Sequence, residues 1–341
     1  MKKIITILFF ITFFTQIFAG QLGDGTNKYQ RTPVYIMDEV KEVSSSSWNT
    51  LILKNDNTLW ACGKNSKGEI NPNKKNIDIP VKLADNIISF CSYFTSIVYT
   101  DTKGDLYLLG DVSSYIKNSK TTFSSRPIKI ASNVKQCLIA YNQLYYVDND
   151  SNLFSYSESY NYFLNCFQGI REEPVVIMQN VKEISYGFSL KILKNDGDLY
   201  SLYNDVPKLI SSDVKKIKGT CFLKNNGDLY CGGTNSYGAL GLGEKTIDFD
   251  YIKLSDDCID MDGNEDVTFF VKSNGDLYVC GGGNKYELGR ATGDGKPHLT
   301  PYKLMTGVKN IHVGFYCGFI IKEDSSLWAF GANSASDIGG I

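Results

Sequence analysis

The segment Leu193–Tyr200, LKNDGDLY, returns almost unchanged twice further along the chain, as Leu223–Tyr230 (LKNNGDLY) and Val271–Tyr278 (VKSNGDLY). Each copy places an Asp-Gly or Asn-Gly pair between two apolar runs, and such a pair is the strongest short-range signal for a β-hairpin with a two-residue turn and positive φ at both turn residues. The strand after the turn begins with a leucine followed by an aromatic residue. Because neighbouring side chains on a strand point to opposite faces, both faces of the expected sheet are apolar and both must be covered.

Four looser copies of this segment complete a set of seven repeats. The anchor leucines of the seven copies lie 47, 47, 46, 30, 48 and 50 residues apart. Each repeat also contains a short alternating strand, which begins with proline in six of the seven repeats, as expected for an outer edge strand that needs no N–H. The anchor leucines are Leu59, Leu106, Leu153, Leu199, Leu229, Leu277 and Leu327. About four short strands per repeat at this period predict an all-β propeller of seven blades.

In several repeats a glycine-rich stretch follows the strand that begins with the anchor leucine. It reads GTNSYGALG at Gly233–Gly241 and GKNSKGEI at Gly63–Ile70, and Asn284–Gly289 is a further copy. These stretches resemble the repeats of the regulator of chromosome condensation family, and the resemblance covers the whole chain after residue 19. It implies a seven-bladed β-propeller. One departure is that a histidine often found ten residues before the anchor leucine is replaced, for example, by Asn49, Ser189 and Cys317.

The two ends of the chain are expected to share one blade. Gln21–Gly25 and the strand at Pro33 read as the second half of a repeat whose first half is Leu327–Gly331. Joining the chain ends in this way closes the ring. Ser336–Gly339 competes with Gln21–Gly23 for the same place, so one of the two must be displaced.

The first 19 residues have the pattern of a secretory signal peptide. Lys2 and Lys3 precede the apolar run Ile4–Phe18, and Ala19 provides a small residue for cleavage. The run is shorter than the roughly 20 residues that a membrane helix needs. We therefore expect residues 1–19 to be a signal peptide and residues 20–341 to be a single secreted or periplasmic propeller domain without a membrane span. A retained single-pass anchor is the alternative.

Composition argues against a nucleic-acid partner and against a metal or redox motif. Without Lys2 and Lys3 the chain has 33 basic and 37 acidic side chains, so it lacks the basic excess that nucleic-acid binding usually requires. The nine cysteines form no C-x-x-C pair, which predicts buried strand residues with room for one or two disulfides. The acidic segment Asp256–Gly263 suggests calcium as an alternative, but Cys258 stands at a place where an EF-hand needs a ligand.

The sequence contains no recognisable set of catalytic groups. Its two histidines, His298 and His312, lie in the last repeat, and each is expected to be hydrogen-bonded or exposed to solvent. No nucleophile elbow, zinc-protease motif or phosphate-binding loop is present. We therefore predict that the protein is not an enzyme and takes no cofactor or metal.

The third repeat carries an unusual loop in place of the glycine-rich stretch. Phe154–Phe163 reads FSYSESYNYF and continues to Phe167. Tyrosine alternating with serine and asparagine is typical of binding loops, where it combines rigid contact area with adaptable hydrogen bonds. The alternative is an irregular blade whose aromatic rings pack inward. The predicted partner-binding residues are Tyr156, Tyr160, Tyr162, Phe163 and Phe167.

The resemblance and the export signal together suggest a function. The founder of the family is a nuclear guanine-nucleotide exchange factor for a small GTPase, and export would remove the chain from that partner. We therefore expect an exported, non-catalytic, monomeric propeller that binds a partner protein through loops on one face, similar in architecture to a secreted propeller that inhibits β-lactamase. The alternatives are guanine-nucleotide exchange and a carbohydrate-binding or hydrolytic propeller.

Overall fold

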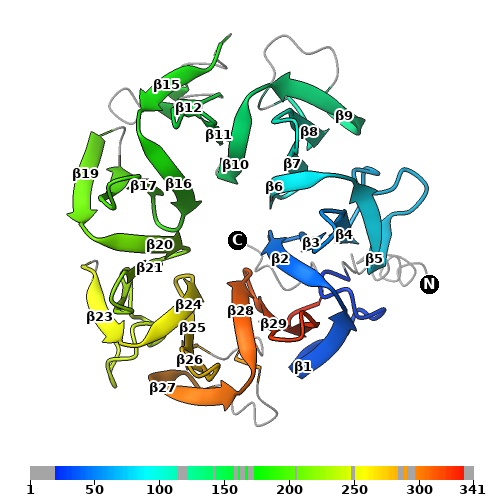
Figure 1. Ribbon diagram of the computed structural model, residues 1–341. Helices are drawn as coiled ribbons and strands as arrows, with labels where there is room; N and C mark the ends of the chain where they lie inside the picture. Colours follow the sequence, from blue (N-terminus) through cyan, green and yellow to red (C-terminus); the bar gives the residue numbers. More distant parts are fainter. Residues whose placement is uncertain are drawn as a thin grey trace, which may run out of the picture.

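Seven four-stranded antiparallel sheets stand around a central channel in the computed structural model (Figure 1). The structure describes residues 20–113, 115, 122–140, 143–156, 160–161, 166–167, 173–203, 206–246, 250–282, 288–289 and 296–333. No helix occurs in these ranges. The predicted fold class, an all-β propeller of seven blades, is confirmed.

The first three blades follow the chain from the innermost strand to the outermost. The first blade contains β2 (Val40–Ser45), β3 (Asn49–Lys54), β4 (Leu59–Lys64) and β5 (Asn76–Ala84). The second contains β6 (Ile87–Tyr93), β7 (Ser96–Asp101), β8 (Leu106–Asp111) and β9 (Phe123–Ala131). The third contains β10 (Val134–Ala140), β11 (Gln143–Asp148), β12 (Leu153–Ser155) and β15 (Val175–Met178), with a separate strand pair β13 (Tyr160–Asn161) and β14 (Cys166–Phe167).

The remaining four blades repeat this order. The fourth contains β16 (Val181–Tyr186), β17 (Leu190–Lys194), β18 (Leu199–Tyr203) and β19 (Val206–Ser211). The fifth contains β20 (Val214–Lys218), β21 (Cys221–Lys224), β22 (Leu229–Cys231) and β23 (Ile252–Ser255). The sixth contains β24 (Cys258–Gly263), β25 (Val267–Lys272), β26 (Leu277–Gly281) and β27 (His298–Met305). The seventh contains β28 (Val308–Val313), β29 (Cys317–Lys322), β30 (Leu327–Gly331) and, as its outer strand, β1 (Gln30–Met37).

The hydrophobic core lies between neighbouring blades. One cluster, for example, joins Leu51, Leu53 and Leu59 of the first blade to Phe90 and Ile97 of the second. Fully burying a leucine or phenylalanine side chain stabilises the fold by about 1.5–3 kcal/mol. The two faces of each sheet are therefore covered by the two neighbouring blades, which explains the apolar residues on both faces of the third strands.

The hairpin turns differ from the two-residue type that the sequence predicted. In the fifth blade, Lys224 N donates to Asp228 O (2.9 Å), and Gly227 N donates to Lys224 O (3.1 Å). Gly227 has a φ of 88°, whereas Asn226 is not among the residues with positive φ. The loop therefore has three residues and only its last one is left-handed. The longer loop lets Asn226 Oδ1 accept a hydrogen bond from Asp228 N (3.0 Å).

The two chain ends meet in the seventh blade, as the sequence predicted. Strand β1 pairs with β30, and Leu22 is 0% exposed. Leu22 N donates to Asn333 Oδ1 (2.9 Å), just as Leu240 N donates to Asn235 Oδ1 (2.9 Å) in the fifth blade. Gln21–Gly23 therefore occupies the place for which two segments competed, while the competing Ser336–Gly339 lies outside the described residues.

Most cysteines are buried strand residues, in line with the sequence expectation. Cys221 and Cys231 face each other on paired strands, with a Cα–Cα distance of 4.1 Å, and form a disulfide. Among the cysteines whose side chains the structure describes, six are free, and all of these but Cys91 are buried. Burial raises the pKa of the Cys258 thiol to about 11 and that of the Cys280 thiol to about 12.

Candidate functional site

The innermost strands of the seven blades surround a cavity of about 950 Å³. Every one of these strands has the same irregularity, a shift in register between its first and third residues. The second residue of each inner strand therefore forms a β-bulge, and a bulge re-aims its side chain relative to the regular strand. One side chain from each blade is directed in this way at the same end of the channel.

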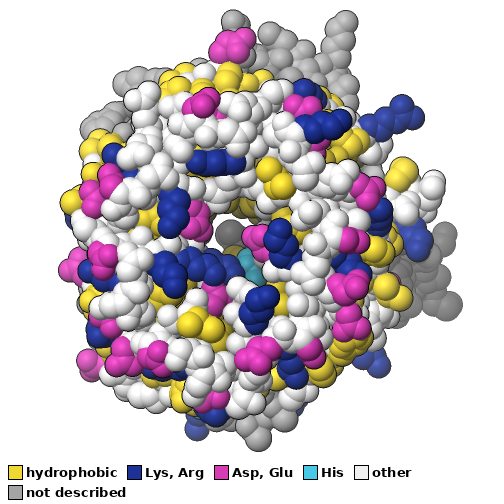
Figure 2. Space-filling view, in the orientation of Figure 1, with side chains coloured by type: hydrophobic (Ala, Val, Ile, Leu, Met, Phe, Trp, Pro, Cys, Tyr) yellow, Lys and Arg dark blue, Asp and Glu magenta, His cyan; other side chains and the backbone are white. Residues whose placement is uncertain are grey.

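Five of these seven bulge residues are lysines, which we call the lysine ring. The seven bulge residues, in chain order, are Lys41, Ile88, Lys135, Lys182, Lys215, Ile259 and Lys309. Lys41 Nζ donates to Asn57 Oδ1 (3.4 Å) and Lys135 Nζ to Ser151 Oγ (2.8 Å). Since Asn57 and Ser151 belong to hairpin turns, the lysine ring lies on the face of the propeller that carries those turns. Figure 2 shows Lys and Arg side chains around the opening of the channel.

The charges of the lysine ring are not neutralised by ion pairs within the described part of the chain. Several lysines on the outer strands, in contrast, are paired with carboxylates. Lys129 lies 2.7 Å from Asp105, Lys253 lies 2.7 Å from Asp228, and Lys303 lies 2.7 Å from Asp276. The end of the channel therefore concentrates positive charge on a protein whose net charge is close to zero.

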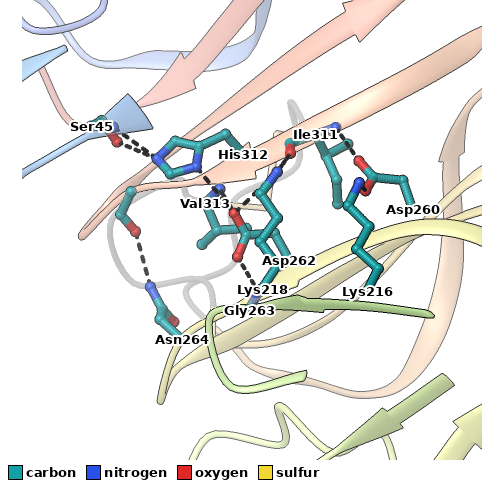
Figure 3. A network of polar contacts seen from close by, with 11 residues as sticks. Ser45, Lys216, Lys218, Asp260, Asp262, Gly263, Asn264, Ile311, His312 and Val313 are labelled. Carbon is teal, nitrogen blue, oxygen red and sulfur yellow. Dashed lines mark hydrogen bonds and ion pairs between the residues drawn. The ribbon is translucent and has the colours of Figure 1, made fainter. Parts of the chain in front are cut away.

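Deeper in the channel, the last three blades bring together five ionisable side chains (Figure 3). Asp260 and Asp262 on β24 are 1% and 3% exposed. Lys216 on β20 bonds Asp260, and Lys218 Nζ lies 3.7 Å from Asp262 Oδ2. His312 on β28 is the fifth member, with Nδ1 3.1 Å from Asp262 Oδ2. Each of the two buried carboxylates thus lies beside a lysine, and the charge of the lysine offsets the cost of burying the carboxylate.

The hydrogen bonds of His312 fix the orientation of its ring. Its Nε2 accepts a hydrogen bond from the backbone N–H of Ser45 (2.8 Å), so this nitrogen carries no proton. The proton lies on Nδ1, which donates to Asp262. Burial favours the protonated form of Asp262, but the charge of Lys218 and the hydrogen bond from His312 outweigh it and hold the pKa of this carboxyl below its ordinary value. Both ring nitrogens of His312 are therefore hydrogen-bonded, as the sequence suggested.

These polar side chains belong to a set of hydrogen bonds that link several of the inner strands to the next one. A side chain at the third strand position accepts a hydrogen bond from the N–H of the fourth residue on the next inner strand, as Gln136 does from Ile184 (2.9 Å) and Asp260 from Ile311 (2.9 Å). A side chain at the fifth position bonds the sixth residue in the same way, as Asp262 does with Val313 (2.9 Å). The acid and base groups of the channel thus hold neighbouring blades together.

Glu183 lines the channel wall beside the cluster. Burial raises the pKa of its carboxyl to about 7, although nearby lysines such as Lys216 oppose this shift.

The acidic segment after Asp256 is divided between the surface and this channel. Asp256 is exposed and pairs with Lys272 (3.0 Å), whereas Asp260 and Asp262 face the seventh blade. Among the residues that the structure describes, no three His, Cys, Asp or Glu side chains converge as a metal site would require.

The tyrosine-rich loop of the third repeat is described only in part. Tyr156, which follows β12, is half-buried against the core between the second and third blades, and burial raises its pKa. The backbone of Tyr160 and Phe167 pairs in the β13–β14 hairpin. Tyr162, Phe163 and the side chains of Tyr160 and Phe167 lie outside the described residues, so their role in binding stays a prediction. Because β12 runs away from its hairpin turn, this loop leaves from the face opposite the lysine ring.

Sequence reasoning missed the lysine ring, although a signal for it is present. An apolar residue followed by lysine recurs at the start of five inner strands, as in Val134-Lys135 and Val308-Lys309. The pair reads as an ordinary alternation of buried and exposed residues. Only the bulge reveals that the five lysines share one end of the channel.

The sheets and their closure define the class of the protein as a seven-bladed β-propeller. Residues 40–69 match the sequence model of the Regulator of chromosome condensation (RCC1) repeat. Together with the seven repeats and the fold, this match to one repeat supports the assignment of the chain to the RCC1 repeat family.

Two curated relatives match parts of the chain. The secretion-regulating guanine nucleotide exchange factor of Bos taurus is 30% identical over 118 residues, which are 33% of this chain and 25% of that protein. The X-linked retinitis pigmentosa GTPase regulator of Mus musculus is 27% identical over 161 residues, 44% of this chain and 15% of that protein. The chain thus matches a quarter or less of the length of either relative.

Solved structures of similar shape cover most of the chain. Human WBSCR16 superposes with a TM-score of 0.70 at 14% identity, covering 89% of this chain and 90% of that one. Prp20p from Saccharomyces cerevisiae, described with its binding to Gsp1p and histones, has a TM-score of 0.66 at 14% identity and covers 87% and 83% of the two chains. At this identity the likeness concerns the fold alone.

No helix in the described residues is long and apolar enough to span a membrane.

Proposed function

We propose that this chain is an exported, non-catalytic propeller that binds an acidic surface of a partner protein with its lysine ring. The observation that carries the proposal is the set of five lysines on bulges at one end of the channel, without ion pairs in the described part of the chain. The N-terminal signal pattern supports export. The names of the curated relatives, a guanine nucleotide exchange factor and a GTPase regulator, support a protein as the partner class.

The bulges make the lysine ring a preorganised surface. Each lysine is fixed at its Cα by a strand that pairs within its blade and contacts the next blade, so the arrangement of the charges is set before any partner arrives. Lys182 Nζ, for example, donates to Lys215 O (3.2 Å) on the neighbouring inner strand and keeps two donors for a partner. Charges of one sign gathered at a surface accelerate the association of an oppositely charged partner and select against others.

The proposal is tested with a synthetic peptide of sixteen glutamates as the probe, at low ionic strength. The variant Lys182→Glu/Lys215→Glu/Lys309→Glu reverses three charges of the ring, and each exposed charge is worth about 0.5 kcal/mol. We therefore expect peptide affinity to fall by about tenfold or more. Wild-type affinity should also fall steeply as salt is added.

A matched control reverses three exposed lysines near the outer strands, and these are Lys28, Lys75 and Lys208. It has the same net charge as the ring variant, and we expect its affinity to stay within about twofold to threefold of the wild type. Equal losses in the two variants, or no wild-type binding at low ionic strength, would overturn the lysine ring as the binding surface. N-terminal sequencing of protein recovered outside the cell tests export, and a chain that stays inside with Met1 intact would overturn that part.

A further inference from the structure

The segment that closes the ring begins at a glycine packed directly against a carboxylate. Gly20 is buried and has a φ of 62°. A Cβ at this position would lie 2.5 Å from Asp78 Oδ1 and 2.7 Å from Asp78 Cα, closer than real Cβ atoms approach. No residue larger than glycine therefore fits here. This is also the residue that follows Ala19, the predicted cleavage point.

Asp78 presents a carboxylate oxygen that lacks a partner. Its Oδ1 is buried and receives no hydrogen bond. A buried polar atom without a partner costs roughly 1–3 kcal/mol, and more if it is charged. The nitrogen and the Cβ position of one residue lie about 2.5 Å apart, so Gly20 N is within about 5 Å of this oxygen. The backbone there is fixed, since Gly25 N donates to Asp78 O (2.9 Å).

The contacts of the next residues place this site at the seam of the ring. Leu22 is held by Asn333 of the seventh blade. Gln21 O accepts a hydrogen bond from Thr50 Oγ1 (2.7 Å), which belongs to the first blade, as does Asp78 on β5. An interaction between residue 20 and Asp78 therefore ties the closing segment of the seventh blade to the first blade.

We infer that cleavage between Ala19 and Gly20 creates an ion pair between the new α-ammonium group of Gly20 and the Asp78 carboxylate, and that this pair locks the ring of the mature protein. Hydrolysis of the Ala19–Gly20 peptide bond consumes one water, leaves a carboxylate on Ala19 and an amine on Gly20, and the amine takes up a proton at neutral pH. An amide nitrogen with one N–H is thereby replaced by a cation with three donors. The inference rests on the proposed export.

The test compares two chains in vitro, one that starts at Gly20 with a free amine and one extended by Ser-Ala in front of Gly20. Each is made with Asp78 and with Asp78→Asn, which gives a double-mutant cycle. We expect Asp78→Asn to lower the Tm of the Gly20-start chain by about 2–4 °C and to leave that of the extended chain unchanged or raised. The larger effect of Asp78→Asn on the Tm of the Gly20-start chain should disappear between about pH 8 and pH 10 as the amine loses its proton.

Equal effects of Asp78→Asn in both chains, or a free-amine advantage that persists above pH 10, would overturn the ion pair. Because both chains are prepared with defined ends, this result does not depend on how cells process the precursor. Sequencing of the exported protein tests export separately, and a native N-terminus other than Gly20 would overturn the cleavage site even if the ion pair forms in vitro.

Discussion

Lys191 on β17 is a lysine enclosed between the fourth and fifth blades, with 1% of its surface exposed. Its Nζ donates to Gly219 O (2.9 Å) and Cys221 O (3.3 Å) and lies 5.2 Å from the centre of the Tyr251 ring. No carboxylate makes an ion pair with it in the described part of the chain. Burial therefore lowers the pKa of Lys191 to about 7.

This pKa makes the stability of the fold depend on pH in a defined direction. In the unfolded chain a lysine keeps its proton up to about pH 10.4. Between pH 7 and that value the unfolded state binds more protons than the folded state, so the free energy of unfolding rises with pH by at most about 1.4 kcal/mol per unit. From pH 7 to 8.5 the contribution of Lys191 is therefore up to about 2 kcal/mol.

The variant Lys191→Met removes this contribution while keeping an unbranched side chain of similar length. Urea unfolding of the wild type and the variant at pH 6.0, 7.0, 7.75 and 8.5 gives the difference in unfolding free energy at each pH. We expect the difference to be nearly constant below pH 7 and then to move in favour of the wild type by about 1–2 kcal/mol up to pH 8.5. The loss of two hydrogen bonds to carbonyl groups adds an offset that does not depend on pH.

Lys194→Met is the matched control, since Lys194 ends the same strand and its Nζ lies over the Tyr200 ring, 5.9 Å from the ring centre. The difference in unfolding free energy between Lys194→Met and the wild type should stay constant from pH 6.0 to 8.5. The series stops at pH 8.5 because the free cysteines begin to ionise in the unfolded chain near that value. Parallel curves for the wild type and Lys191→Met would show that Lys191 stays charged in the folded protein and would refute the reasoning.

Three further predictions concern other parts of the ring. Leu22→Ala should lower the free energy of unfolding by about 2–5 kcal/mol in urea titrations, because it empties a closed site at the seam, whereas the exposed Leu242→Ala should change it little. Ser325→Gly should raise the Tm slightly, with a gain of about 0.5–1 kcal/mol, since Ser325 has a φ of 65° at a turn position where four other blades have glycine. A lower Tm would contradict this. Replacing Tyr160 and Tyr162 with alanine should weaken capture of the partner with little change in Tm, and a large loss of stability would instead place these rings in the core.

The sequence was sufficient to predict the fold because each repeat encodes its blade locally. An anchor such as Leu229 and the aromatic Tyr230 after it make both faces of a strand apolar, and the turn before them gives the direction of the next strand. Ring closure was also predictable, because Gln21–Gly25 supplies the half-repeat that Leu327–Gly331 lacks. The type of hairpin turn was not predictable, because Asn226 forms a local hydrogen bond that favours the longer loop.

The polar groups of the channel could not be predicted in the same way. Asp262 and His312 lie 50 residues apart in the sequence and meet because consecutive inner strands stand side by side. In the sequence, Asp262 belongs to an acidic run that resembles a loop. Only its burial beside Lys218 shows that it is a polar group of the channel wall that bonds the next blade. The partner-binding role of Tyr156 and its neighbours is still a prediction from composition.

The sequence by itself determined the number of blades, the order of strands within each blade and the joining of the two chain ends, since each of these follows from a pattern that repeats along the chain. The tertiary structure decided which side chains share the channel. A bulge in each inner strand turns Lys41, Lys182 and their counterparts toward one end, and the circular arrangement brings charges together that are separated by more than 30 residues in the sequence. Such a surface depends on the geometry of the ring, which no single repeat contains.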